Sequence, residues 1–415
     1  MAKEIHPAGT VPGYRIALII LGIAMSPVLL SGSRIGSQLS LHDTIRAIVT
    51  GSLILAAIGC MTGAIGQRAR MNTYQIVRYA FGTKGSLAIN ALLAISLFGW
   101  ICVTANSFGM ALQELLSMGG WHLPLFPLVA FGCILFVAAT AFGFEVLGKV
   151  ALYSIPVLLL ILGYCLHRFF TLAPMHIGSH SGELSVGVAT SSVVGTFMIL
   201  ATTMPDFGCM VHNRRHALQG AILALGIAYP LLYIAGALPT ALSGQDSLVS
   251  AMALTASTLP ALSLLLFSTI TGNAGNLFQG TLVTSTLMPA VTRPRITMML
   301  GALACLIGSQ DLVNWFIPFL LFLGIAVPPI AGIYIADYLM NRREGYDEKE
   351  LESLPAVPVA AFVVWGVATL VGFLTSRQAL TLTGIPSLDA LLVASVLFTL
   401  QSRTFGLPRT ANQEV

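Results

Sequence analysis

The sequence predicts an all-α integral membrane protein with about twelve transmembrane helices. Only 9% of its 415 residues are charged and 56% are hydrophobic, whereas a soluble domain usually carries about 25% charged residues. Apolar runs close to the roughly 20 residues that a helix needs to cross a bilayer recur along the whole chain. The small net charge of +4 does not indicate a nucleic-acid partner.

The predicted spans follow the apolar runs, which polar or turn-forming segments separate. We place them at residues 14–37, 44–66, 86–117, 123–142, 146–167, 185–205, 217–241, 257–284, 294–310, 312–340, 356–375 and 384–402. The third, eighth and tenth are longer than a bilayer requires. We therefore expect these three to be tilted or to continue into short interfacial helices.

The basic residues predict the orientation of the chain. With the N-terminus in the cytoplasm, 16 of the 20 Lys and Arg residues fall on the inner side. Cytoplasmic loops are enriched in Lys and Arg, so this bias favours cytoplasmic N- and C-termini and an even number of spans. We expect a multi-pass protein of the cell inner membrane. The outer basic residues are Arg34, Arg46, Arg168 and Arg377.

Two spans contain residues that interrupt helices. The first holds Ser26-Pro27, and the sixth holds three threonines and a proline between Gly195 and Asp206. Proline removes one helical donor, and a membrane helix breaks only where protein or a water-filled cavity receives the freed groups. An offset of roughly 170 residues pairs Ser26-Pro27 with Thr196-Phe197, as expected of transporters built from inverted repeats. Ordinary proline kinks are the alternative.

This pairing predicts how the chain is organised. Two five-span repeats would be followed by two accessory spans. The predicted segments are a cytoplasmic N-terminus (1–13), the first repeat (14–167), an outer loop (168–184), the second repeat (185–340), a cytoplasmic loop (341–355), the accessory spans (356–402) and a cytoplasmic tail (403–415).

Trp100 and Phe197 are candidates for stacking on a flat ligand. Trp100 follows Gly99 in the middle of the third span, away from the interfaces where tryptophan is enriched. Its indole offers a flat face, although packing against Gly99 explains its position equally well. Phe197 lies at the predicted break of the sixth span and would face the third. The hydroxyl of Thr196 could bond a ligand or its own helix backbone.

The eighth span is rich in small and polar residues from Ser268 to Asn276. Small residues allow close helix packing, whereas asparagines bring several donors and acceptors into a region of low dielectric. Oxygen atoms beside an unwound helix also suit a coupling ion such as sodium. At the inner end of the sixth span, Asp206 is a candidate for gating or coupling, with solvation or capping as the alternative.

The segment from Pro328 to Arg343 reads Pro-Pro-Ile-Ala-Gly-Ile-Tyr-Ile-Ala-Asp-Tyr-Leu-Met-Asn-Arg-Arg. It closely resembles the tenth span of bacterial cytosine permeases, which belong to the nucleobase:cation symporter-1 family, the purine-cytosine permease family, and it is the most specific match. Weaker matches occur in the right order along nearly the whole chain, at Ile35-Gly36, Ser40 to Asp43, Arg78 to Gly85, Gly99-Trp100, Gly195 to Phe197 and Asp206-Phe207.

The resemblance implies a LeuT-type fold with discontinuous first and sixth helices and cation-coupled import of a nucleobase-like compound. It implies that the base lies between Trp100 and Phe197, with polar contacts from Thr196 and Asn273. We also expect Ser96 among the substrate-contacting residues of the third span. The implied sodium ligands are carbonyl oxygens of Gly22, Met25 and Ser268 and the hydroxyl of Thr271.

Three residues depart from the family pattern. Leu97 replaces a glutamine, Ile199 replaces a serine that helps to read cytosine, and Gly272 replaces the second hydroxyl of the sodium site. A site built to hydrogen-bond a ligand rejects one lacking those groups by factors of about 10⁴ or more, so a different or less polar heterocycle is expected. Water or Asn276 would replace the missing sodium oxygen, or protons would couple transport instead.

We therefore expect a secondary transporter that imports cytosine or a related pyrimidine or purine by alternating access. Hydroxymethylpyrimidine or another small heterocycle is the alternative substrate, and H⁺ is the alternative to Na⁺. We expect no other cofactor and no nucleic-acid partner, and the oligomeric state stays open. A membrane-embedded enzyme is disfavoured because the sequence has no His-Glu-x-x-His or Gly-x-Ser-x-Gly motif. A non-transporting sensor is a further alternative.

Overall fold

The computed structural model describes residues 11–141, 143–173, 184–310, 312–343, 345–347 and 350–404. Within these ranges the chain is helical, apart from its connections and one isolated bridge between Val11 and Val211. The predicted N-terminal segment, outer loop and C-terminal tail fall mostly outside the described residues.

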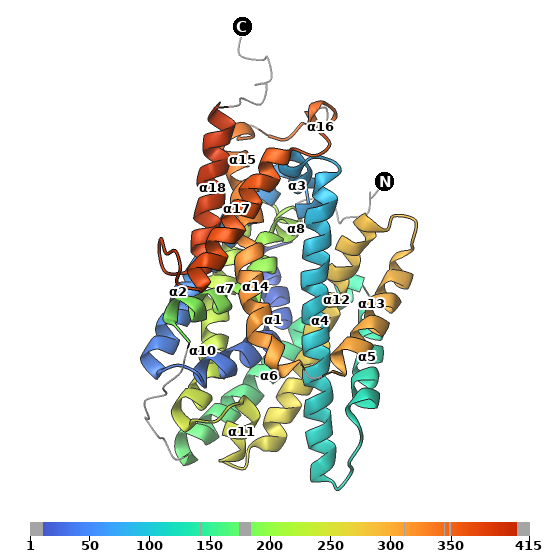
Figure 1. The fold of residues 1–415 in the computed structure, drawn as a ribbon. Helices are drawn as coiled ribbons and strands as arrows, with labels where there is room; N and C mark the ends of the chain where they lie inside the picture. Colours follow the sequence, from blue (N-terminus) through green and yellow to red (C-terminus); the bar gives the residue numbers. More distant parts are fainter. Residues whose placement is uncertain are drawn as a thin grey trace.

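The helices form one elongated bundle (Figure 1). Short helices α3, α8 and α16 lie toward one end, and α11 lies at the other. We call these the α3 end and the α11 end. The helices are α1 (Gly13–Gly36), α2 (Leu41–Ala69), α3 (Thr73–Phe81), α4 (Gly85–Met118), α5 (Leu125–Ala141), α6 (Gly143–Leu172), α7 (Val186–Thr202), α8 (Pro205–Gly208), α9 (Arg214–Ala221), α10 (Tyr229–Ser243), α11 (Leu248–Ala253), α12 (Thr258–Leu287), α13 (Arg293–Gly308), α14 (Phe316–Ala326), α15 (Pro328–Asn341), α16 (Glu350–Ser353), α17 (Val359–Ser376) and α18 (Pro386–Thr404).

Most of the predicted spans correspond to helices able to cross a membrane. Among the described residues, nine helical segments are long and apolar enough to do so. The other three predicted spans correspond to α5, α13 and α18, which fall outside those limits of length and composition. The chain is therefore a multi-pass membrane protein, and the count of twelve spans stays a prediction.

The structure shows no interruption in the first span and a different position for the interruption in the sixth. The helix α1 continues through Pro27, because neighbouring helices can accommodate a proline inside a membrane helix. The sixth span is interrupted, but only after α7 ends at Thr202 and before α8 begins at Pro205. Pro205 is the residue that ends regular helical bonding there. Thr196 and Phe197 therefore lie within α7.

Close backbone contacts hold α7 and α1 in place. A Cβ atom added at Gly195 would lie 2.0 Å from the carbonyl oxygen of Leu320 on α14. One added at Gly36 would lie 2.3 Å from the carbonyl oxygen of Ala237 on α10. Small residues permit this approach between membrane helices. The glycine of the Gly195-Thr-Phe segment thus fixes the distance of α7 from α14.

Candidate functional site

A small cavity lies between α1, α4, α7 and α12. Five of the predicted substrate residues line it: Leu97, Trp100, Thr196, Phe197 and Ile199. The other lining residues are Ile23, Pro27, Leu200, Asn276 and Gln279. Its free volume of about 20 Å³ corresponds to one water molecule rather than a heterocycle. We call it the central cavity.

Trp100 is held in place by two aromatic residues of α14. Its ring lies 6.1 Å from the ring of Phe316 and 5.6 Å from that of Phe319, both nearly perpendicular. Edge-to-face packing of this kind fixes the orientation of an indole. The space at Gly99 is occupied by Phe319, since a Cβ there would lie 2.5 Å from that ring. Because Gly99 has no side chain, the Phe319 ring packs directly on α4 there, and it also packs against Trp100.

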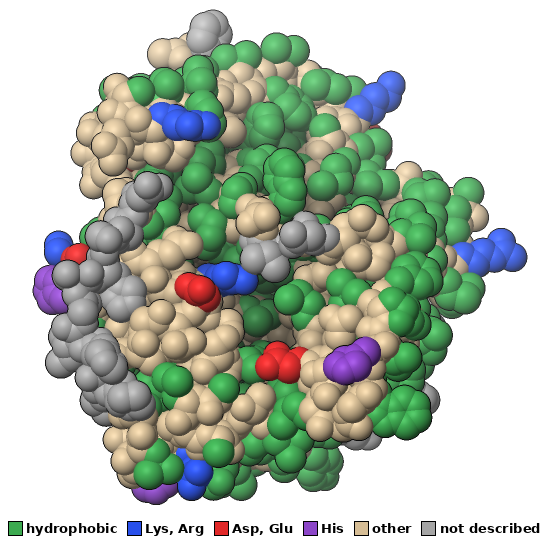
Figure 2. All heavy atoms as spheres, turned by 60° about the horizontal axis from the view of Figure 1, so that its bottom comes forward, with side chains coloured by type: hydrophobic (Ala, Val, Ile, Leu, Met, Phe, Trp, Pro, Cys, Tyr) green, Lys and Arg blue, Asp and Glu red, His purple; other side chains and the backbone are tan. Residues whose placement is uncertain are grey.

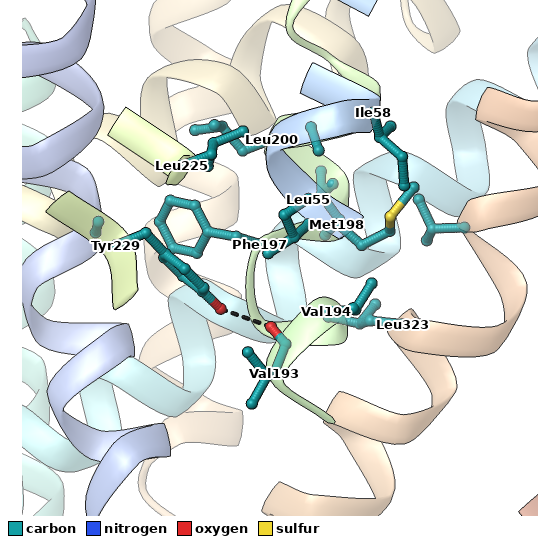
Figure 3. Close-up of a cluster of buried hydrophobic side chains, with 14 of the residues drawn as sticks. Leu55, Ile58, Val193, Val194, Phe197, Met198, Leu200, Leu225, Tyr229 and Leu323 are labelled. Atoms are coloured by element: carbon teal, nitrogen blue, oxygen red, sulfur yellow. Dashed lines mark hydrogen bonds between the residues drawn. The ribbon is translucent and has the colours of Figure 1, made fainter. Parts of the chain in front are cut away.

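Phe197 packs against Tyr229 of α10 (Figure 3). Its ring centroid lies 5.3 Å from that of Tyr229, whose hydroxyl donates to the carbonyl of Val193 at 2.6 Å. The Thr196 hydroxyl donates to the Ser192 carbonyl at 2.9 Å and lies 3.3 Å from the Tyr233 hydroxyl. Thr196 thus bonds its own helix in this conformation, one of the two alternatives that the sequence left open.

Asn273 and Ser96 lie away from the lining of the central cavity. The Asn273 side chain accepts a bond from the Thr104 hydroxyl at 2.6 Å and donates to the Ile101 carbonyl at 3.3 Å. These bonds tie α12 to α4. The Ser96 hydroxyl donates to the Leu92 carbonyl within α4 at 2.7 Å. In this conformation helix–helix and local bonds occupy the polar groups of both residues, and their contact with a substrate stays a prediction.

Asn276 and Gln279 line the central cavity instead, and the sequence analysis did not assign them to the substrate. The Nδ2 atom of Asn276 is buried and has no hydrogen-bond partner among the described residues. A buried polar group without a partner costs about 1–3 kcal/mol, so a ligand or water in the cavity would satisfy it. Asn276 and Gln279 are three residues apart and therefore share one face of α12, but no signal in the sequence of α12 shows that this face meets the cavity.

The predicted sodium ligands lie where α1 meets α12. A Cβ added at Gly272 would lie 3.1 Å from the carbonyl oxygen of Ile23 and 3.9 Å from that of Gly22. The Ile23 carbonyl has lost its usual helical donor because residue 27 is a proline. The Thr271 hydroxyl donates to the Ser268 carbonyl at 3.0 Å, so two expected ligands are bonded to each other. Met25 is fully buried in the same part of α1.

Asp206 joins α8 to α3. Its carboxylate accepts a bond from the backbone N–H of Thr73, the first residue of α3, at 2.7 Å. A carboxylate at a helix N-terminus is favourable because the helix dipole is positive there. This is the capping contact that the sequence left open for Asp206, and its gating role stays a prediction. Arg70 reinforces the junction by donating to the carbonyls of Val211 at 2.7 Å and His212 at 3.0 Å.

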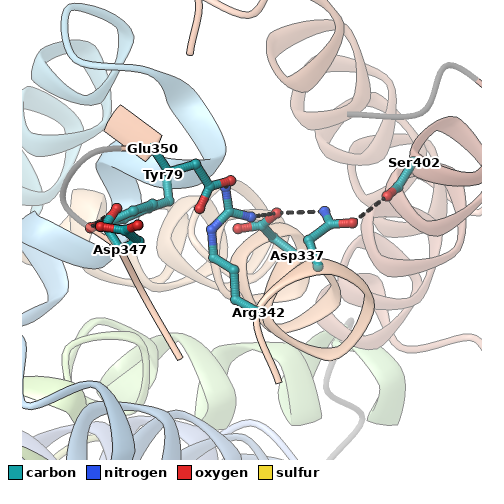
Figure 4. Close-up of polar contacts among 7 residues, drawn as sticks. Tyr79, Asp337, Arg342, Asp347, Glu350 and Ser402 are labelled. Carbon is teal, nitrogen blue, oxygen red and sulfur yellow. Dashed lines mark hydrogen bonds and ion pairs between the residues drawn. The ribbon is translucent and has the colours of Figure 1, made fainter. Parts of the chain in front are cut away.

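A buried cluster around Arg342 closes the α3 end further (Figure 4). The guanidinium pairs with Asp337 and, at 2.8 Å, with Glu350, and its carbon lies 5.1 Å above the Tyr79 ring. Burial raises the pKa of the Glu350 carboxyl, and the nearby guanidinium opposes that rise. The Tyr79 hydroxyl donates to the Asp347 carbonyl at 3.2 Å. Through these contacts α3 is attached to both α8 and α15.

A larger hollow opens at the α11 end, between α1, α4, α11, α12 and α14, with a volume of about 160 Å³. Phe316 lines this hollow, and its ring packs against Trp100, which lines the central cavity. The Phe316–Trp100 contact therefore lies between the two spaces. The bundle is tied together at the α3 end and hollowed at the α11 end.

The arrangement of the helices is similar to that of several solved structures. The chain resembles Mhp1, a nucleobase-cation-symport-1 family transporter, in a closed conformation with bromovinylhydantoin bound: TM-score 0.81, 21% identity, covering 95% of this chain and 93% of that one. The inward-facing conformation of Mhp1 gives a TM-score of 0.80 at 20% identity, covering 95% and 91%. A Na⁺-coupled sialic acid symporter gives 0.66 at 10% identity, covering 96% and 91%. The fold is the LeuT-type fold, as the resemblance implied.

The family follows from the sequence. The pattern of the permeases for cytosine/purines, uracil, thiamine and allantoin matches residues 14–379, and the chain belongs to this family. It is 28% identical to the cytosine permeases of Escherichia coli K12 and O157:H7 over 362 residues, covering 85% of this chain and 84% of theirs. These relatives are permeases rather than enzymes, which confirms the predicted family and class.

Proposed function

We propose that the protein imports a flat, nucleobase-like heterocycle across the cell inner membrane by cation-coupled alternating access. The observation that carries this proposal is the central cavity, in which Trp100 and Phe197 meet the unsatisfied amide of Asn276. Two aromatic residues suit the faces of a planar ring, and an amide suits its polar edge. Two comparisons support a nitrogen heterocycle as the substrate. Mhp1 has bromovinylhydantoin bound, and the relatives in Escherichia coli are cytosine permeases.

The cavity lining suggests how such a ring is read. The amides of Asn276 and Gln279 can each donate and accept, so they match a ring edge with a carbonyl beside an N–H. Leu97 and Ile199 give the same cavity an apolar side, which suits a ring with an apolar substituent. Cytosine is the first candidate, and hydroxymethylpyrimidine or another small heterocycle is the alternative. Because the cavity holds only one water, the substrate enters as α7 and α14 move apart from α4 and α12.

The two ends of the bundle suggest the direction of access. The basic residues predict that the α3 end faces the cytoplasm, and there the Asp206–Thr73 bond and the Arg342 cluster hold the helices together. The hollow at the α11 end then faces outward. We propose that release into the cytoplasm requires α8 to leave α3, which breaks the Asp206–Thr73 bond. This gives Asp206 its gating role.

We propose sodium as the coupling ion, transported with the substrate. The carbonyl oxygens of Ile23 and Gly22 lie 3.1 and 3.9 Å from a Cβ position at Gly272 of α12, and Ser268 and Thr271 belong to the same helix. Hard cations prefer such oxygen atoms, and unwound or proline-freed carbonyls of the first helix supply them in transporters of this type. For sodium to bind, the Thr271 hydroxyl would turn its oxygen from Ser268 toward the ion. Asp206 is the candidate acid if protons couple transport instead.

Replacing sodium decides between the two ions. Uptake into proteoliposomes would be measured at fixed pH, with sodium replaced by choline on both sides. Sodium coupling predicts that uptake falls to the level of protein-free vesicles. Undiminished uptake rules out sodium, and proton coupling through Asp206 would then require that Asp206→Asn abolishes uptake driven by a pH gradient while substrate binding persists.

A binding screen tests the substrate class. Purified protein would be heated in detergent with a panel of cytosine, uracil, hypoxanthine, allantoin and hydroxymethylpyrimidine, each at a saturating concentration. A ligand that binds only the folded state at 100 times its Kd stabilises it by about 2.7 kcal/mol. The proposal predicts a raised melting temperature with at least one member. No stabilisation by any member would contradict a nucleobase-like substrate.

A further inference from the structure

The hollow at the α11 end has room for a single ring. Its volume of about 160 Å³ compares with the roughly 150 Å³ of an engineered protein cavity that binds benzene. Figure 2, which turns this end forward, shows a hollow bordered by basic and acidic side chains. The lining residues include Ser33, Arg34, Asn106, Ser107, Glu114 and Phe316.

Arg34 stands apart from the other basic residues predicted on the outer side. Arg46 pairs with Asp43 at 3.5 Å, Arg168 donates to the Thr255 carbonyl at 2.8 Å, and Arg377 lies 5.4 Å above the Phe373 ring. Within the part of the chain that the structure describes, the Arg34 guanidinium makes no hydrogen bond or ion pair. It lines the hollow together with the carboxylate of Glu114. Since none of the described residues pairs with it, the Arg34 guanidinium is available to a ligand.

The neutral polar groups of the hollow are already engaged. The Asn106 amide donates to the carbonyls of Gly308 and Gln310 at 2.8 and 2.9 Å, and the Ser107 hydroxyl donates to the Val103 carbonyl at 2.9 Å. Arg34 on α1 and Glu114 on α4 are therefore the groups available to a ligand. Together they disfavour an anion, which Glu114 repels, and a cation, which Arg34 repels. A neutral ring with both an acceptor and an N–H donor suits them.

From these contacts we infer that the hollow is a second, outer binding site for the same neutral heterocycle, an inference that rests on the proposed function. The Arg34 guanidinium donates a hydrogen bond to a ring carbonyl or ring nitrogen, and the Glu114 carboxylate accepts a hydrogen bond from a ring N–H. Phe316 offers its ring beside the site and also touches Trp100. A heterocycle held there would move into the central cavity when the Phe316–Trp100 contact opens.

The number of molecules bound per chain tests this inference. Equilibrium binding of radiolabelled cytosine, uracil, hypoxanthine, allantoin and hydroxymethylpyrimidine would be measured on the full chain in detergent. We expect two sites in the wild type for the compound that is transported. Arg34→Gln combined with Glu114→Gln should leave one site and weaken the other at least tenfold. Arg46→Gln removes the same charge from an outer residue that does not line the hollow, and should retain two sites.

A complementary variant addresses the central cavity. Trp100→Ala should lose the central site and keep the outer one, and Trp100→Leu, which keeps an apolar side chain without an aromatic face, replaces it if the alanine variant does not fold. One site in the wild type that Arg34→Gln and Glu114→Gln leave unchanged would overturn the outer site while leaving the proposed function intact. Absence of binding of every compound to the wild type would overturn the proposed function and the outer site together.

Discussion

Truncation of Trp100 tests the central cavity most sharply. The side chain is 4% exposed and packs on Phe316 and Phe319 through edge contacts. Replacing a buried tryptophan by alanine costs about 3–5 kcal/mol of stability, so Trp100→Ala lowers the melting temperature without ligand. The same change removes one face of the proposed stack. Stacking of a base on an aromatic side chain contributes about 1–3 kcal/mol, which predicts a Kd about 5- to 150-fold higher.

The assay separates these two effects because ligand stabilisation is measured against each variant's own baseline. The panel member that stabilises the wild type would be added at 100 times its wild-type Kd, which gives about 2.7 kcal/mol. If Trp100→Ala raises Kd a hundredfold, the same concentration gives only about 0.4 kcal/mol. Trp121→Ala is the matched control, because Trp121 is 67% exposed and does not line the central cavity. A folded Trp100→Ala protein with full ligand stabilisation would refute the stacking role.

Three further variants test other parts of the account. Arg342→Met leaves the carboxylate of Asp337 buried without its partner, which predicts that the free energy of unfolding falls by about 3–5 kcal/mol. Arg343→Met, at the exposed neighbouring position, should change it by less than about 0.5 kcal/mol, and equal effects of the two variants in thermal unfolding would contradict a buried pair. Ile199→Ser adds a hydroxyl to the central cavity, and one added hydrogen bond contributes about 0.5–1.5 kcal/mol. Equilibrium binding should therefore show a Kd for cytosine about 2- to 12-fold lower, and an unchanged or higher Kd would count against a position of residue 199 beside the ring. Asp206→Ala removes the hydrogen bond from the Thr73 N–H to the Asp206 carboxylate, which contributes about 1.5–3 kcal/mol because the acceptor is charged. If this bond holds α8 against α3, its loss exposes Cys209, which should then react faster with a membrane-impermeant maleimide added from the cytoplasmic side. An unchanged reaction rate would contradict the gating role.

The positions of Trp100 and Phe197 beside the central cavity could be predicted from the sequence, mainly through the family resemblance. A tryptophan in the middle of a span and a phenylalanine beside an interrupted one are visible without knowledge of neighbouring helices. Both line the central cavity, together with Leu97, Thr196 and Ile199. That these residues contact a substrate stays a prediction.

The orientation of α12 could not be predicted in the same way. Its polar residues are spread around the helix, so composition does not say which asparagine faces α4 and which faces the cavity. Asn273 bonds Thr104, whereas Asn276 is left with an unsatisfied amide in the cavity. Which asparagine faces the cavity depends on the partner residues of α4, and the sequence of α12 alone does not show which of its residues meet them.

The positions of the interruptions were also set by tertiary contacts. Pro27 does not end α1, which continues past it. The Ile23 carbonyl lacks its usual helical donor because residue 27 is a proline, and α12 packs against this carbonyl at Gly272. The break in the sixth span lies at Pro205 rather than at Thr196, since a hydroxyl bonded to its own helix leaves the helix intact.

The measurement that tests the central claim most directly is uptake into proteoliposomes that contain the purified protein. Each radiolabelled member of the heterocycle panel would be offered outside, with an inward sodium gradient, an inward proton gradient or neither. The account predicts that at least one heterocycle accumulates above its external concentration only when a cation gradient is present, and that Trp100→Ala abolishes this accumulation at the same concentration. Uptake of every panel member no greater than in protein-free vesicles, under both gradients, would contradict it.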